Sequence, residues 1–154
     1  MSRKKSNPGS FDKVLEKIEA LTPRHTDQVP WLTSLLDHPD ATIRLAALNA
    51  LVHRFGISDL TAKLLPLLDS ETDDDVLLVL ISALSTHYRG AKDPTLIKRC
   101  QAAVDRLGGS FEGTREALDD AKLRVMLGYD TKQIVTMPMD ERLRQLAALN
   151  AEIT

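Results

Sequence analysis

The sequence has few aromatic residues and a single cysteine. Aromatic residues make up 4% of its 154 residues, whereas hydrophobic residues make up 43%. The interior must therefore be built from Leu, Ala, Val and Ile, a composition that suits closely packed helices. The lone Cys100 cannot form an internal disulfide, which favours a reducing compartment, and we expect a cytoplasmic protein. Because Cys100 shares a helical face with Leu96, Ile97, Ala103 and Val104, we expect it to be a small core residue.

The sequence also lacks a strong charge of one sign and a long apolar run. The formal net charge is -2, and no basic stripe is present, so a nucleic-acid partner is disfavoured. No stretch approaches the roughly eighteen apolar residues of a membrane span, so no membrane contact is expected. Residues 1–9 are polar and carry Arg3, Lys4 and Lys5, and we interpret them as a flexible basic tail.

Three clusters resemble functional sites, but each has a simpler structural explanation. The segment from Gly108 to Arg115 is glycine-rich but lacks the Lys of a phosphate loop, so it is expected to be a helix–helix connection. The acidic turn from Asp69 to Asp75 lacks the Gly and Glu of a calcium loop, and helix capping explains it better. His53 and His87 are too few for a zinc site. We therefore predict no catalytic residue, no metal and no cofactor.

Helical spacing of apolar residues runs through residues 10–154, which we expect to form a single domain. Ser10 is a candidate cap for the first helix, which Pro23 ends. Asp40 is a candidate N-cap for a helix that Gly56 stops. The apolar face of that helix combines aliphatic residues with small ones that allow close packing: Ile43, Ala46, Ala47, Ala50 and Leu51.

This helix pair repeats along the chain. The segment 31–37 aligns with 63–69, thirty-two positions later, and the apolar stripe of 43–51 aligns with that of 76–84, thirty-three positions later. Residues 31–56 and 63–90 are therefore the clearest repeats of a stacked helical array. A looser third pair is predicted from Asp93 or Pro94 to Leu107 and from Thr114 to Leu127. One short helical turn and a last helix after Pro138 follow.

The stretch Leu36–Leu51 resembles the second half of a HEAT repeat, since it has acidic turn residues, an aliphatic–Arg pair (Ile43-Arg44) and a small-residue stripe that ends in Ala-Leu. Leu68–Leu84 is similar but has Leu77 in place of Arg44. The resemblance covers residues 31–84. It implies an all-α fold, a right-handed α-solenoid of about three HEAT-like helix pairs with irregular terminal helices.

Both repeats have apolar residues outside their core stripes, which is unusual for a two-layer array. Either the C-terminal segment or a partner must cover them. In HEAT-like arrays the inner helices line the concave binding groove, so the resemblance implies a partner-binding face, with Arg44 and Asn49 as polar specificity elements. We assign to it Arg44, Leu45, Leu48, Asn49, Val52, Leu78, Ile81, Ser82 and Ser85.

The fold and this face favour a non-catalytic protein–protein interaction module: an adaptor, a scaffold or an inhibitory, immunity-type partner. The ligand is expected to be another protein or a second copy of the chain. One alternative is binding to a nucleic-acid backbone, which requires Arg3, Lys4, Lys5, Arg89, Lys92, Lys98 and Arg99 to converge. Another is an enzyme-assisting subunit like those of the bilin-lyase-like HEAT branch, although no residue supports a cofactor.

Overall fold

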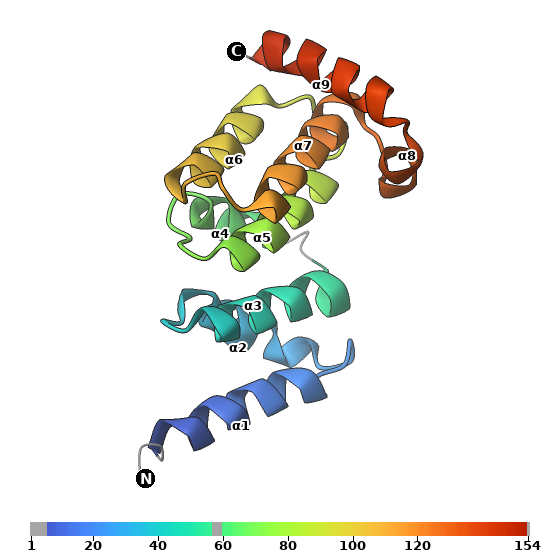
Figure 1. Ribbon diagram of the computed structural model, residues 1–154. Helices are drawn as coiled ribbons and strands as arrows, with labels where there is room; N and C mark the ends of the chain where they lie inside the picture. Colours follow the sequence, from blue (N-terminus) through green and yellow to red (C-terminus); the bar gives the residue numbers. More distant parts are fainter. Residues whose placement is uncertain (1–5, 57–59, 154) are drawn as a thin grey trace. The chain divides into compact units, whose positions relative to one another are not determined.

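A computed structural model describes residues 6–56 and 60–153, with the side chains of residues 6–10 left aside (Figure 1). Within these ranges every regular element is helical, as the apolar spacing predicted. The chain divides into two compact units, Met1–Ile57 and Ser58–Thr154. The two predicted clear repeats fall one in each unit, and the grouping of residues 10–154 as a single domain stays a prediction.

Unit 1 begins with α1 (Ser6–Ala20). A 3-10 turn (Thr26–Gln28), α2 (Val29–Ser34) and a second 3-10 turn (Leu35–Asp37) follow. The unit ends with α3 (Ala41–Ala50) and a π-helical segment (Leu51–Phe55). The start of α1 corrects two expectations, because residues 6–9 are helical and Ser10 lies inside the helix. Pro8 is compatible with this start, since a proline in the first turn removes an N–H that has no helical partner.

Within unit 1, α3 packs against both α1 and α2. Asp40 is its N-cap, as predicted, and its carboxylate accepts a hydrogen bond from the Thr42 amide at 2.8 Å. The Lys17 ammonium of α1 lies 4.1 Å from the ring centre of Trp31 on α2, a cation–π contact. The core of the unit consists of fully buried aliphatic residues, among them Ile18, Leu32, Ile43, Ala47 and Leu51.

The π-helical segment ends at Gly56, whose φ of 80° lies in the left-handed region that favours glycine. The predicted role of Gly56 as a helix stop is therefore confirmed. One residue pair fixes this segment to α1: the Arg54 guanidinium donates to the Ile18 carbonyl at 2.6 Å. That carbonyl is one of the last four of α1, which have no partner inside the helix.

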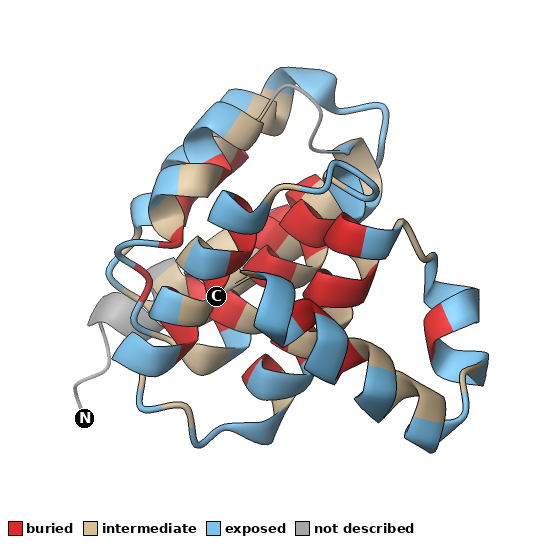
Figure 2. Ribbon diagram, turned by 90° about the horizontal axis from the view of Figure 1, so that it is seen from above, coloured by how far each residue is buried: buried red, intermediate tan, exposed pale blue. Residues whose placement is uncertain are grey.

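Unit 2 contains two helix pairs and a C-terminal extension. The pairs are α4 (Thr61–Leu67) with α5 (Asp74–His87), and α6 (Pro94–Arg106) with α7 (Glu112–Leu127). The extension is α8 (Thr131–Thr136) and α9 (Met139–Ile153). Helices α5 and α7 carry the most buried residues and form the most extensive helix contact of the unit. Figure 2 shows burial along the chain.

Equivalent helices of the two pairs lie side by side and run parallel. Leu78 near the start of α5 lies against Gly113 near the start of α7, and Ser85 near the end of α5 lies beside Arg124. In the other layer, Arg99 and Arg106 of α6 bond to carbonyls at Leu65 and Leu68, at the end of α4. Helix pairs that stack in register in two layers are the arrangement of an α-solenoid.

Aspartates cap three helices of unit 2: α5, α6 and α8. The α5 helix begins at Asp74, and Asp73 is its N-cap, whose carboxylate accepts a hydrogen bond from the Val76 amide at 3.0 Å. The α6 helix was predicted to begin at Asp93 or Pro94; it begins at Pro94, and Asp93 caps it by accepting from the amides of Thr95 and Leu96. Asp130 forms a reciprocal capping box with Gln133 in α8.

We expect Asp93→Ala to lower the free energy of unfolding by about 1 kcal/mol, because two amides of the first turn of α6 lose their acceptor. Thermal unfolding monitored by circular dichroism measures the effect. Asp105→Ala, at an exposed position near the end of the same helix, is the matched control. It should be neutral or slightly stabilising, since a negative charge near a helix C-terminus is unfavourable. Equal losses in the two variants would contradict the capping role.

Candidate partner-binding surface

The predicted face of α5 is mostly covered by the chain itself. Ile81 and Ser85 are 0% and 1% exposed. Leu78, Ile81 and Ser85 share one side of α5 by helical spacing, and both Leu78 and Ser85 neighbour α7. The Arg124 guanidinium lies 3.4 Å from the Ser85 hydroxyl oxygen. Of the two explanations for the extra apolar residues, coverage by a later segment of the chain therefore applies to Ile81, and that segment is α7, which also covers Ser85.

The predicted residues of α3 and its π-helical extension divide in the same way. Leu48 is fully buried, whereas Leu45, Asn49 and Val52 are half-buried. Arg44 donates to the carbonyls of His38 and Pro39, at 2.9 and 3.1 Å. Its guanidinium therefore stabilises the turn before α3, and its role as a polar specificity element stays a prediction.

A small apolar surface remains at one end of α5. Leu78 and Ser82 are half-buried and one turn apart on the helix. A Cβ added to Gly113 would lie 2.8 Å from Leu78 Cδ1 and 2.8 Å from Phe111 Cε2, so both side chains meet above the glycine backbone. Phe111, the residue before α7, is 38% exposed. We call Leu78, Ser82 and Phe111 the α5 patch.

Phe111 was not among the predicted site residues, because its position in a glycine-rich connection gave no sign of its neighbours. An exposed aromatic residue beside an aliphatic one is the kind of anchor that dominates the energy of protein interfaces. The absence of a side chain at Gly113 is what allows the N-terminal turn of α7 to approach Leu78.

Two arginines of α6 form hydrogen bonds to other residues of unit 2. Arg99 Nη2 donates to the Leu65 carbonyl and to Asp69 Oδ2, both at 3.0 Å. Arg106 Nη2 donates to the carbonyls of Leu68 and Glu71, both at 2.9 Å. Arg99 belongs to the basic set that nucleic-acid binding required, and Arg3, Lys4 and Lys5 of that set lie outside the described residues. The structure therefore adds no support for a nucleic-acid interface.

The acidic turn before α5 has structural roles. Glu71 is 4% exposed, and its Oε2 accepts from the amides of Thr72 and Asp73, both at 3.0 Å. Asp73 caps α5, and Asp69 pairs with Arg99. The predicted explanation by capping is confirmed for Asp73, whereas Glu71 and Asp69 stabilise the turn and the contact with α6.

The single thiol lies in the core, as predicted. Cys100 is 1% exposed, and burial raises its pKa to about 12, although the neighbouring Arg99 favours the thiolate. The thiol therefore stays protonated near neutral pH and is a poor nucleophile. Among residues 6–56 and 60–153, no three His, Cys, Asp or Glu side chains are grouped so that they could hold a metal ion. No helix in the described part of the chain is long and apolar enough to cross a membrane.

The comparison with known proteins agrees with the repeat pattern. The model of the HEAT-repeat family, described as HEAT repeats, matches residues 14–85, from within α1 to within α5. No curated protein and no solved structure gives a significant match. HEAT repeats build α-solenoids, and the parallel stacking of equivalent helices in unit 2 has this form, so the predicted all-α solenoid class is confirmed. Residues 14–85 therefore have the pattern of HEAT repeats, as the resemblance of residues 31–84 implied.

Proposed function

We propose that this protein is a non-catalytic interaction module, an adaptor, a scaffold or an inhibitory partner, which binds another protein in the cytoplasm. The observation that carries the proposal is the HEAT-repeat match over residues 14–85, since HEAT repeats generally act as protein-interaction scaffolds. Each unit contributes its own candidate surface: the α5 patch in unit 2, and Arg44 with the half-buried Leu45, Asn49 and Val52 in unit 1. Leu48 supports the surface of unit 1 from the interior, and Ile81 and Ser85 support that of unit 2.

The α5 patch supports the proposal on energetic grounds. An exposed Phe and a half-buried Leu in contact supply apolar area that a partner removes from water, worth about 25 cal/mol per Å². Ser82 adds a hydroxyl at the edge of this area. Its backbone carbonyl already accepts from the hydroxyls of Ser85 and Thr86, at 3.1 and 2.8 Å. An aromatic centre with a polar edge is the usual composition of a protein–protein interface.

Affinity capture from the native cell, followed by mass spectrometry, tests the proposal when a patch variant is compared with the wild type. The variant combines Phe111→Ser and Ser82→Arg. Serine is a good N-cap for α7, and arginine at the edge of the patch obstructs a close partner without burying a charge. We expect the wild-type chain to enrich a protein that the variant recovers at least about tenfold less, since the loss of one anchor costs over 1 kcal/mol.

Leu127→Ser is the matched control. Leu127 is also an exposed apolar residue of unit 2, at 42% against 38% for Phe111, and it lies at the other end of α7. The control should recover the partner as the wild type does, and circular dichroism should show that all three proteins are folded. Recovery of the same protein by wild type and patch variant in equal amounts would overturn the assignment of the surface. Failure of the wild-type chain to enrich any protein would contradict the function.

A further inference from the structure

A cleft away from the α5 patch opens where α6, α7 and α9 meet. Its volume is about 510 Å³, within the range of small-molecule sites. Ile97 and Ala102 of α6 and Ile153 of α9 supply its apolar surface. Its polar lining comes from α6, α7 and α9 and consists of Lys98, Gln101, Asp105, Lys122 and Asn150.

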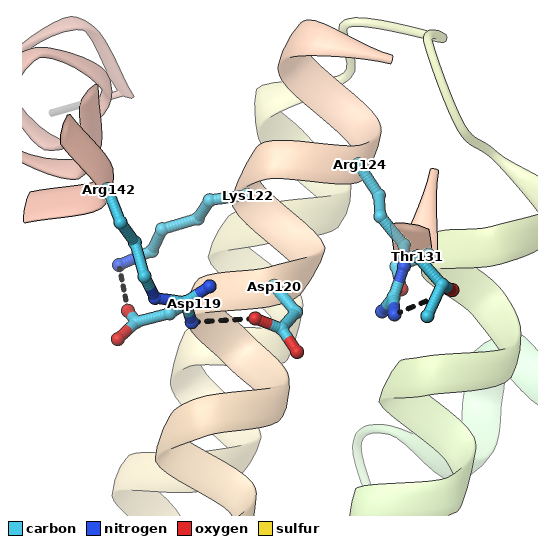
Figure 3. A network of polar contacts seen from close by, with 7 residues as sticks. Asp119, Asp120, Lys122, Arg124, Thr131 and Arg142 are labelled. Atoms are coloured by element: carbon cyan, nitrogen blue, oxygen red, sulfur yellow. Dashed lines mark hydrogen bonds and ion pairs between the residues drawn. The ribbon is translucent and has the colours of Figure 1, made fainter. Parts of the chain in front are cut away.

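Lys122 is the unusual residue of this cleft. Its side chain is 8% exposed, and its ammonium lies 3.8 Å from Asp119 Oδ1, too far for a hydrogen bond. Within the described part of the chain, no other hydrogen bond or ion pair of the Lys122 side chain is present. Figure 3 shows Lys122 and Arg124 leaving α7 on opposite sides, with Lys122 on the side of Arg142 of α9. An ammonium carries three donors, and at 3.8 Å the Asp119 carboxylate neutralises its charge without accepting a hydrogen bond, so a ligand in the cleft can accept one.

The other charges of the cleft restrict the ligand that could satisfy Lys122. Asp105 accepts from the Gln101 amide at 3.0 Å, and Lys98 is exposed at the edge. With Asp119 beside Lys122, two ammonium groups face two carboxylates, so the cleft has no excess charge that would hold a dianion, and a singly charged anion suits it better. A carboxylate offers acceptors to the Lys122 donors, while Ile97, Ala102 and Ile153 can cover a short aliphatic body.

We propose that the cleft between α6, α7 and α9 binds a short aliphatic carboxylate through the Lys122 ammonium. The group could be part of a free organic acid or the C-terminal carboxylate of a peptide, because both present the same two oxygens on an apolar stem. This site is separate from the α5 patch and does not depend on the proposed interaction function.

Titration of the full-length protein with hexanoate, followed by NMR of the backbone amides, tests the site. We expect saturable shifts at residues 97–105, around Lys122 and at 150–153, with a dissociation constant on the order of 1 mM. Hexan-1-ol has the same body without the charge and should bind at least about tenfold more weakly, because a charge-assisted hydrogen bond is lost. Equal binding of the acid and the alcohol, or the absence of saturable shifts at tens of millimolar, would overturn the proposal.

Lys122→Met keeps the aliphatic stem and removes the ammonium, and it should weaken hexanoate binding by at least about tenfold. Lys63→Met, at an exposed position on α4, is the matched control and should leave binding unchanged. Ala102→Phe is a second variant that does not depend on the folding of Lys122→Met, because Ala102 is exposed and the new ring occupies the cleft. Unaltered hexanoate binding in either cleft variant would show that the ligand lies elsewhere.

A short acetylated peptide that ends in Leu distinguishes the two sources of the carboxylate. If a peptide terminus is the natural ligand, the free-acid peptide should bind more tightly than hexanoate, and its C-terminal amide should lose at least about tenfold. If a free acid is the natural ligand, the peptide should bind more weakly than hexanoate. Each of these results supports the carboxylate site, whereas equal binding of acid and amide peptides would count against it.

Discussion

Ile81→Asp should abolish the folded state of unit 2. Ile81 is 0% exposed on the side of α5 that neighbours α7, so the substitution removes a buried aliphatic side chain and places a carboxylate where no water reaches it. Burial of an unpaired charge, together with the lost packing, should cost more than about 4 kcal/mol. This is comparable to the whole free energy of unfolding of a small domain. Loss of the helical circular dichroism signal and of the cooperative thermal transition is the expected result.

Ala62→Asp is the control for this experiment. It introduces the same side chain at an exposed position in the first turn of α4, where a negative charge is neutral or mildly favourable. Its melting curve should match that of the wild type. A folded Ile81→Asp protein with an unchanged transition would mean that α7 does not cover this side of α5. In that case Ile81 would again be a candidate for the partner-binding surface.

Arg106→Met should destabilise unit 2 by about 2 kcal/mol, because the carbonyls of Leu68 and Glu71 lose their donor. Both residues are buried at the turn between α4 and α5, so water is a poor substitute. For a unit of this size the expected fall in melting temperature is roughly 8–16 °C. Methionine keeps most of the apolar stem, so the change reports mainly on the hydrogen bonds.

Arg89→Met is the matched control for Arg106→Met. Arg89 also carries a guanidinium, but it lies 4.0 Å from Asp130, and both side chains are about half exposed, at 48% and 51%. Such a surface pair contributes little, so the control should change stability by less than about 0.5 kcal/mol. Similar melting temperatures for the two variants would show that the bonds between α6 and the α4–α5 turn do not stabilise the stack.

Two kinds of contact hold the helices together. Aliphatic side chains of α5 and α7 supply the apolar burial, and arginines one repeat further along the chain donate to carbonyls near the ends of earlier helices. Arg54 in unit 1 bonds to the Ile18 carbonyl thirty-six residues earlier, and Arg99 and Arg106 in unit 2 bond to carbonyls thirty-four to thirty-eight residues earlier. Each of these bonds supplies a donor to a carbonyl at or just beyond the end of an earlier helix, where intrahelical partners are lacking.

The sequence by itself determined the helices, most of their limits and the HEAT-repeat pattern of residues 14–85. Helical spacing, capping aspartates and glycine stops are local signals, so Asp40 and Gly56 could be assigned from their neighbours in the chain, and the start of α6 could be placed at Asp93 or Pro94. The two-repeat alignment was enough to identify the HEAT pattern, because the apolar stripe recurs at a fixed period. The role of Cys100 was also predictable, since its helical face is apolar on both sides of it.

Only the tertiary structure decided which apolar residues are covered and which polar groups converge. Leu78 and Ile81 look alike in the sequence, yet Ile81 is buried, whereas Leu78 is half-exposed beside Phe111, thirty-three residues further along. The cleft around Lys122 joins α6, α7 and α9, whose relative positions no local pattern specifies. The physical reason is that burial depends on which helices pack together, and this is set by contacts between residues far apart in the chain.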